Sequence, residues 1–392
     1  MTHSSLRRPA VIVIAAASAL TAACGMLSDP APPPHQSGSL ALVVGHRNNM
    51  PRPRLVGAHG QQVLTDSIRS QDTLYVIDVS GDPRLDYSQA MTGQCDSTIS
   101  CDNLARRYGS LVDQALSQVK AESPEANTLQ AIAVAAQSVA DKPGPKHIVV
   151  IDNGLQTTGE MPLQGPGALA ADPDKVAQTL HDAGRLEKLL AGTEITLIGL
   201  GNAHSPQKSL SQPTLDNLKT LWDKVLRKAG AANVYIEPEP LPNEAPGEGL
   251  PTVSVVPDNV DAPPPLTPCT HLREDQVGSF LGGKAEFVDP ERARRVLTPI
   301  AQKIIAEKTT ATLKGTTALP QPTGPDSLSN QRAQTVKGML VSLGVPEALL
   351  RTVGVATSFD GYVDPRSPDG VFKETVAVQD RLVIIELAGA HC

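Results

Sequence analysis

The stretch LSNQRAQTVKGMLVSLGV (residues 328–345) decides how the last third of this chain folds. Gly344 lies near its end, at a position where glycine commonly terminates a helix. Apolar side chains recur before it at the spacing of one helix face: Ala333, Val336, Leu340 and Leu343. The pattern predicts one amphipathic helix that carries a single arginine, Arg332, on its first turn.

The segments around this helix predict a small α+β domain over residues 269–392. Asp289 followed by Pro290 is a typical start for a preceding helix, because Asp caps free N–H groups and Pro fits the first turn. Strands are expected in TATLKGTT (310–317), LLRTVGVAT (349–357) and RLVIIEL (381–387). The expected order is β-α-β-α-β-β, with the two helices on one face of the sheet.

These segments resemble the OmpA-like C-terminal domain from about Val277 to Leu387. Residues 328–345 match its signature L-S-x-x-R-A-x-x-V-x-x-x-L-x-x-x-G-V, VDPERARRVLTPIA looks like its preceding helix, and DRLVIIEL looks like its closing strand. The family binds peptidoglycan non-covalently. The resemblance implies that Arg332, with Ser329 and Arg381 nearby, grips the carboxylate of a diaminopimelate peptide stem. A guanidinium suits this role, because it makes two charge-assisted bonds to one carboxylate.

The chain also departs from that family pattern. The family motif G-H-T-D after the second strand reads GTTA here, so Ala318 stands where the ligand-binding Asp is expected. Asp326, two residues before Leu328, is the nearest carboxylate and the candidate acid of the site, although it does not align with the missing Asp. The family motif N-R-R-V at the last strand reads DRLV here, so of its two arginines only Arg381 is kept. The loop SFDGYVDPRSPDG (358–370) is remodelled as well. Two readings stay open: a weaker peptidoglycan site, or a degenerate one in which Arg332 only pairs with a surface carboxylate such as Asp326.

Residues 39–237 predict an α/β domain with an open, mostly parallel sheet and helices on both faces. Continuous apolar runs separated by helical patterns are typical of strands that are covered on both sides. The expected strands are 40–45, 74–81, 147–154, 195–201 and 233–236. The expected helices are 103–121, 127–140, 174–192 and 214–230.

Polar residues follow two of these strands and begin one helix. Asp78, Ser80 and Asp82 follow the second strand, Asp152 follows the third, and Thr128 opens a helix. This arrangement resembles the metal-ion-dependent adhesion site of von Willebrand factor type A domains, which uses D-x-S-x-S, a Thr and a later Asp. The resemblance implies a Mg²⁺ or Mn²⁺ ion held by these oxygen ligands. The alternative is that the same residues only cap helices and turns.

The N-terminus resembles that of bacterial lipoproteins. Arg7 and Arg8 precede an apolar run at 10–23, which is too short to span a membrane. LTAACGM follows, with small residues before Cys24, although Leu20 lies one place further from the cysteine than usual. The resemblance implies a signal peptide at 1–23, a lipid on Cys24 and a Pro/Ser tether at 24–38. The alternative is an ordinary cleaved signal peptide.

Export to an oxidising compartment favours disulfides for the four remaining cysteines. Three pairings are possible, and we favour Cys95–Cys101, which closes a short loop, with Cys269–Cys392, which joins the two ends of the C-terminal region. Residues 238–268 are rich in Pro and acidic residues and predict a linker between the two domains.

The sequence argues against several classes of function. A net charge of −7 without a basic patch is unlike a nucleic-acid-binding protein. The sequence contains no HExxH, G-x-S-x-G or glycine-rich nucleotide loop, so an enzyme is not expected. We expect a protein anchored to the cell membrane by lipid, whose C-terminal domain contacts peptidoglycan and whose α/β domain is presented to an unknown envelope protein. The alternative is a scaffold lipoprotein with a degenerate peptidoglycan site.

Overall fold

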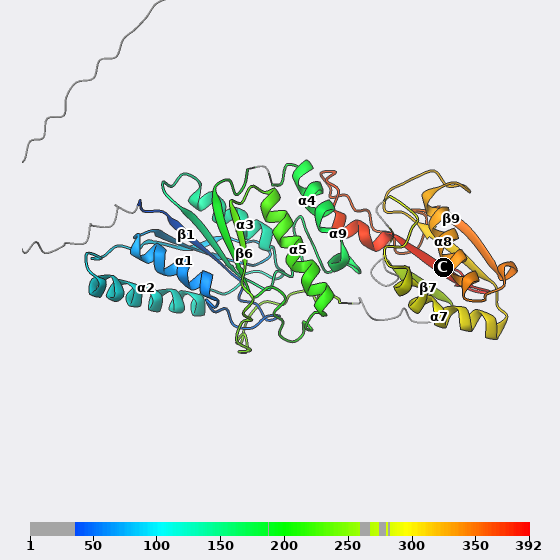
Figure 1. The fold of residues 1–392 in the computed structure, drawn as a ribbon, viewed down its shortest axis with the longest axis horizontal. Coiled ribbons are helices and arrows are strands. Elements are labelled where there is room, and N and C mark those ends of the chain that lie inside the picture. Colours follow the sequence, from blue (N-terminus) through cyan, green and yellow to red (C-terminus); the bar gives the residue numbers. More distant parts are fainter. Residues whose placement is uncertain (1–35, 187, 259–266, 274–279, 281–282) are drawn as a thin grey trace, which may run out of the picture. The chain divides into compact units, whose positions relative to one another are not determined.

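The computed structural model describes residues 36–392 apart from 187, 259–266, 274–279 and 281–282 (Figure 1). The expected signal peptide and Cys24 lie outside the described residues, as does nearly all of the tether. Within the described part of the chain, no helix has the length and apolar character needed to span a membrane.

Residues 39–236 form a six-stranded sheet in the order β3-β2-β1-β4-β5-β6. All neighbouring strands are parallel except β2 and β3, which are antiparallel. The edge strand β3 was not expected from the sequence, because its polar side chains hide the alternation of a strand. The strands are β1 (Ser39–Val44), β2 (Thr73–Asp78), β3 (Leu85–Ala90), β4 (Lys146–Ile151), β5 (Thr193–Ile198) and β6 (Asn233–Ile236).

Helices cover both faces of this sheet, as the apolar strands predicted. Alternate residues of β1 point to opposite faces: Leu40 and Leu42 pack with α1 and α2, whereas Ala41 and Val43 pack with α3, α4 and α5. Figure 1 shows α1 and α2 side by side. The helices are α1 (Ala58–Arg69), α2 (Thr98–Gln118), α3 (Thr128–Ala140), α4 (Pro173–Asp182) and α5 (Gln212–Lys228), with a 3₁₀ turn η1 (Ala168–Ala170).

One expected helix ends ten residues early. The apolar spacing predicted a helix from 174 to 192, but α4 stops at Asp182. Gly184 has a φ of +70°, a left-handed conformation that terminates a helix. Leu186 and Leu190 are still fully buried in the same core. The helical spacing of these leucines therefore arises because they are buried in a non-helical segment, and not because α4 continues.

The first part of the expected linker is bound to the α/β domain. Residues 241–256, called the cover segment below, contain no strand. The segment buries Leu241, Val253 and Val256. Val256 exchanges two hydrogen bonds with the side chain of Gln207, at 2.8 and 2.9 Å. Its proline and acidic residues are typical of a linker, and the segment indeed forms no regular helix or strand. Its backbone groups nevertheless form hydrogen bonds with side chains from the rest of the chain, such as Gln207 and Asn202.

Residues 269–387 form a second sheet in the order β7-β10-β8-β9. Only β8 and β9 are parallel, and α7 and α8 bury their apolar faces in the core of this sheet. Asp289 caps α7 by accepting from the Arg292 amide, as predicted. The elements are β7 (Cys269–Arg273), α7 (Pro290–Glu307), β8 (Ala311–Thr316), α8 (Leu328–Ser342), η2 (Glu347–Leu349), β9 (Leu350–Ala356), α9 (Glu374–Ala377), η3 (Val378–Asp380) and β10 (Leu382–Leu387).

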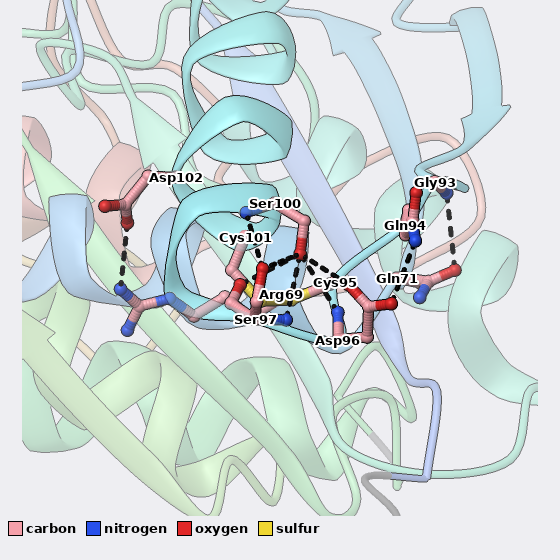
Figure 2. Close-up of a disulfide and its surroundings, with 10 residues drawn as sticks. All are labelled: Arg69, Gln71, Gly93, Gln94, Cys95, Asp96, Ser97, Ser100, Cys101 and Asp102. Atoms are coloured by element: carbon pink, nitrogen blue, oxygen red, sulfur yellow. Dashed lines mark hydrogen bonds and ion pairs between the residues drawn. A yellow bond between two sulfur atoms is a disulfide. The ribbon is translucent and has the colours of Figure 1, made fainter.

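Both favoured disulfides are present. Cys269 and Cys392 are joined across a sequence separation of 123 residues, and Cys95 and Cys101 across 6. Figure 2 shows the shorter one at the N-terminus of α2, where Ser97 and Ser100 cap each other's backbone amides. The long bridge therefore closes the C-terminal domain, and the short one fixes the start of one helix.

Candidate functional site

The N-terminus of α8 is pressed against the second sheet. A Cβ atom at Gly315 of β8 would lie 1.7 Å from the backbone oxygen of Ser329, so only glycine fits there. The Ser327 side chain caps the helix by accepting from the Asn330 amide at 3.2 Å. The Ser329 hydroxyl, which sequence analysis placed in the peptidoglycan site, is buried and lies 3.1 Å from the Ser327 hydroxyl.

Arg332 is the fifth residue of α8, just past the first turn on which it was expected, and its side chain is turned inward. It is 2% exposed. Its guanidinium donates to the carbonyl oxygens of Lys284 and Thr316, each at 3.4 Å, and lies 5.3 Å from the centre of the Phe280 ring. These two carbonyls and the aromatic face help to hold the guanidinium in its inward orientation. Asp326 is exposed, and its backbone oxygen accepts from Gln331.

Arg381 has an acidic partner within the protein. Its two terminal nitrogens each donate to one carboxylate oxygen of Glu374, both at 2.6 Å. Glu374 is 5% exposed and belongs to α9, in the segment that connects β9 to β10. The pair has the fork geometry that the family resemblance assigned to a ligand carboxylate.

The two arginines line one cavity of about 280 Å³ beside Ala318. Its other lining residues include Leu328, Phe372 and Lys175. Tyr362 donates from its hydroxyl to the Ala318 carbonyl at 3.3 Å, so the segment connecting β9 to β10 also reaches this edge. The lining thus combines apolar side chains with two arginines and a lysine, of which Arg381 is already paired with Glu374 and Lys175 lies 3.9 Å from Asp172. Ala318 supplies no acid for a ligand ammonium.

Burial affects the acid next to this cavity. Asp380 immediately precedes Arg381, is fully buried and accepts from the Val363 amide at 3.2 Å. Removal from water raises the pKa of Asp380 to about 6. This carboxyl therefore changes charge in mildly acidic solution, next to the Arg381–Glu374 pair.

The connecting segment also contacts the α/β part of the chain. Lys373 donates to the Gly159 carbonyl at 2.8 Å, and Arg185 pairs with Asp369 at 2.5 Å. Val378 is buried in the core that α3, α4 and α5 share. The segment that carries Glu374 therefore contacts both the edge of the cavity, through Tyr362, and the α/β part of the chain, through Lys373 and Asp369.

The five expected metal ligands are only partly brought together. Thr128 donates to Asp152 at 2.9 Å, as the predicted site requires. Asp78 lies at the end of β2, two strands from Asp152 and therefore roughly 10 Å away along the sheet. It accepts from the Arg84 amide at 2.7 Å, and burial raises its pKa. Ser80 is buried after the same strand, whereas Asp82 is exposed.

The place beside Asp152 is filled by an arginine that sequence analysis did not consider. Arg47 pairs with Asp152 at 2.6 Å, and neither side chain is exposed. Within the residues that the structure describes, no group of three or more His, Cys, Asp or Glu is placed to hold a metal ion. Asp78 lies two strands from Asp152, and Asp152 is paired with Arg47, so the five expected ligands are not gathered around one position.

Two residues that contact the candidate sites, Arg47 and Glu374, were not predicted, for different reasons. Arg47 follows the first strand in VVGHRNNM, and alternate positions there give Gly45, Arg47 and Asn49, the same spacing as D-x-S-x-S. That spacing is visible in the sequence, but only the structure shows that β1 adjoins β4, which places this loop beside Asp152. Glu374 had no sequence signal, because nothing local to residue 374 indicates that its carboxylate reaches Arg381.

Comparisons with known proteins give distant similarities. No family model matches the chain, and no curated relative does. Among solved structures, the OmpA-like domain of FopA1 from Francisella tularensis is 17% identical, with 31% of this chain and 75% of that chain covered, at a TM-score of 0.22. The periplasmic domain of Helicobacter pylori MotB is 16% identical, with 30% and 74% covered, at 0.23. The cell wall anchor of the T6SS from Pseudomonas aeruginosa is 20% identical, with 30% and 78% covered, at 0.24. Scores this low carry no argument about function.

Proposed function

We propose that this chain is a cell-envelope protein whose C-terminal domain binds peptidoglycan non-covalently at the cavity lined by Arg332 and Arg381. The observation that supports the proposal is the meeting of these two guanidinium groups at one cavity beside Ala318. The L-S-x-x-R-A motif singled out Arg332. The elements run β7-α7-β8-α8-β9-α9-β10, which differs from the expected β-α-β-α-β-β order by the short helix α9 between the last two strands.

A diaminopimelate stem offers the chemistry that this cavity can recognise. Its carboxylate suits a guanidinium such as that of Arg332, which lines the cavity and can donate two charge-assisted hydrogen bonds to one carboxylate. Its ammonium group lacks the acid that the family motif supplies, because Ala318 occupies that position. The site is therefore proposed to bind weakly and to depend on salt.

One observation favours a second function. The Glu374 carboxylate already occupies both terminal nitrogens of Arg381. In this alternative the peptidoglycan site is closed from within, and the chain is an interaction scaffold in an envelope complex. The connecting segment, which contacts both the cavity and the α/β part, supports such a structural role.

The remaining parts of the proposal concern attachment. We propose that lipid on Cys24 anchors the chain to the cell membrane, on the periplasmic or cell-wall side, and that the α/β domain is presented to another envelope protein. A pull-down of the fragment 36–392 with purified peptidoglycan tests the function. Retention that Arg332→Ala removes supports peptidoglycan binding, and no retention of the unmutated fragment favours the scaffold.

A further inference from the structure

The carboxyl ends of β1, β2 and β4 are where a ligand is expected in a sheet of this order. The chain runs from β1 to β2 on one side and later places β4 on the other, so the strand order reverses at β1. Open α/β sheets bind their ligands beyond such a reversal. The loop after β1 and the residues after β4 meet there, and both are buried.

Arg47 follows β1, the strand that lies between β2 and β4, and its guanidinium contacts residues that follow both of those strands. One terminal nitrogen lies 2.6 Å from Asp152 Oδ1 and donates to Asn153 Oδ1 at 3.1 Å. The other donates to the Val79 carbonyl, after β2, at 3.2 Å. Three oxygens from two strand ends therefore surround one guanidinium.

Asp152 is held in place for this contact. Its other oxygen, Oδ2, accepts from the Thr128 hydroxyl and from the Gly154 amide, both at 2.9 Å. A carboxylate that is fully buried requires a nearby positive charge, because desolvation of an unpaired charge is very costly. Arg47 supplies that charge from within the chain.

We propose that Arg47 is a resident cation, which takes the place of a divalent metal ion at this edge and makes the α/β domain independent of metal. The oxygens around its guanidinium are a carboxylate, an amide oxygen and a carbonyl oxygen, the types that Mg²⁺ and Mn²⁺ prefer. The guanidinium occupies the space between them, and its charge repels a second cation.

Two further features close the edge to a metal. A Cβ atom at Gly45 would lie 2.0 Å from Asp152 Oδ1, so no additional ligand side chain fits at that position. The cover segment packs over the same loop: both ring nitrogens of His46 lie 2.6 Å from backbone oxygens, one of Val119 and one of Pro246. The Arg47–Asp152 pair is thereby sealed from solvent.

The test asks whether removing the guanidinium creates a metal site. Mn²⁺ binding to the fragment 36–392 is measured by electron paramagnetic resonance and by the shift of the melting temperature. Arg47→Ala is expected to bind one Mn²⁺ and to melt at a higher temperature when Mn²⁺ is present. Arg47→Ala combined with Asp152→Asn is expected to lose both effects, because the carboxylate ligand is gone.

Two controls complete the experiment. Arg47→Lys keeps a positive charge and is expected to ignore Mn²⁺, as is Arg84→Ala, which removes an exposed arginine that pairs with Asp82 and Glu122. If Arg47→Ala is recovered unfolded, its yield on refolding is compared with and without Mn²⁺, and a yield that rises with Mn²⁺ supports the proposal. The proposal is overturned by Mn²⁺ binding to the unmutated fragment that Asp152→Asn abolishes, by a folded Arg47→Ala that binds none, or by a refolding yield that Mn²⁺ leaves unchanged.

Discussion

Glu374 and Arg381 form a partly buried two-pronged ion pair, in which each carboxylate oxygen lies 2.6 Å from one terminal nitrogen of the guanidinium. The carboxylate comes from α9, and the guanidinium lines the cavity that Arg332 also lines. A ligand carboxylate that used Arg381 would therefore compete with a carboxylate of the protein itself.

Replacing Glu374 is expected to strengthen peptidoglycan binding. Glu374→Gln removes the negative charge but keeps the size of the side chain, so a ligand carboxylate no longer competes with the Glu374 carboxylate for Arg381. We expect several-fold more fragment retained on peptidoglycan, with a loss of roughly 1–3 kcal/mol in the free energy of unfolding. Sedimentation with peptidoglycan and thermal melting measure the two effects.

Glu160→Gln is the matched control for that experiment. Glu160 pairs with Arg185 and Lys373, so its removal loosens the connecting segment without touching the Arg381 pair. If both variants change retention equally, the effect belongs to the segment and not to competition at Arg381. Unchanged retention in Glu374→Gln would remove the reason for assigning Arg381 to the site.

The two disulfides are expected to differ in their contribution to stability. A disulfide restricts the unfolded chain more when it closes a longer loop, by roughly 5 kcal/mol for a loop of about 120 residues and roughly 2 kcal/mol for one of about 7. The double serine variant of Cys269 and Cys392 should therefore unfold at a lower denaturant concentration than the double serine variant of Cys95 and Cys101. The reverse order in a denaturant titration would show that strain or local packing dominates.

Asp380 is expected to make the protein less stable as the pH rises through mildly acidic values. Its pKa is about 6 in the folded protein against an ordinary value of 3.8, so the folded state binds more protons between these values. Stability from this group is full below about pH 4 and falls until about pH 6, by roughly 3 kcal/mol at most. Asp380→Asn should flatten this fall. Equal slopes in the two proteins, measured by denaturant unfolding from pH 4 to 7, would contradict the assignment.

The proposed lipid anchor predicts a change of fraction. Lipid attached to Cys24 would supply the membrane affinity, so Cys24→Ser in the full chain should move the protein out of the membrane fraction. Fractionation followed by mass spectrometry of the N-terminus measures both the location and the lipid. A Cys24→Ser protein that has lost its signal peptide and still sediments with membranes would rule out this anchor.

Long, regular elements were predictable from the sequence. The strands of the first sheet were found because they are buried on both faces and read as continuous apolar runs, and α8 was found because Gly344 and the apolar face agree. The helix α1 (Ala58–Arg69), the edge strand β3 and the short extent of α4 were missed. For β3 and α4, the local sequence pattern and the tertiary contacts disagree: β3 has exposed polar side chains, and Leu186 and Leu190 are buried outside any helix.

The candidate sites depended more on tertiary contact. Arg332 was identified from its motif, but its inward orientation over Phe280 required the structure. The adhesion-type motif was placed after the second strand, whereas the loop next to β4 in the sheet follows β1 and carries Arg47. Strand order, which the sequence does not state, decides which loop meets Asp152.

The most direct test of peptidoglycan binding is sedimentation of the fragment 36–392 with purified diaminopimelate-type peptidoglycan at two salt concentrations. The account predicts weak retention that falls at high salt, is lost in Arg332→Ala, is partly kept in Arg332→Lys and increases in Ala318→Asp, because that variant restores an acid for the ligand ammonium. Arg351→Ala, which removes an exposed arginine of β9, should retain as much as the unmutated fragment. Retention of folded Arg332→Ala equal to that of the unmutated fragment, or no retention of the unmutated fragment, would contradict the account.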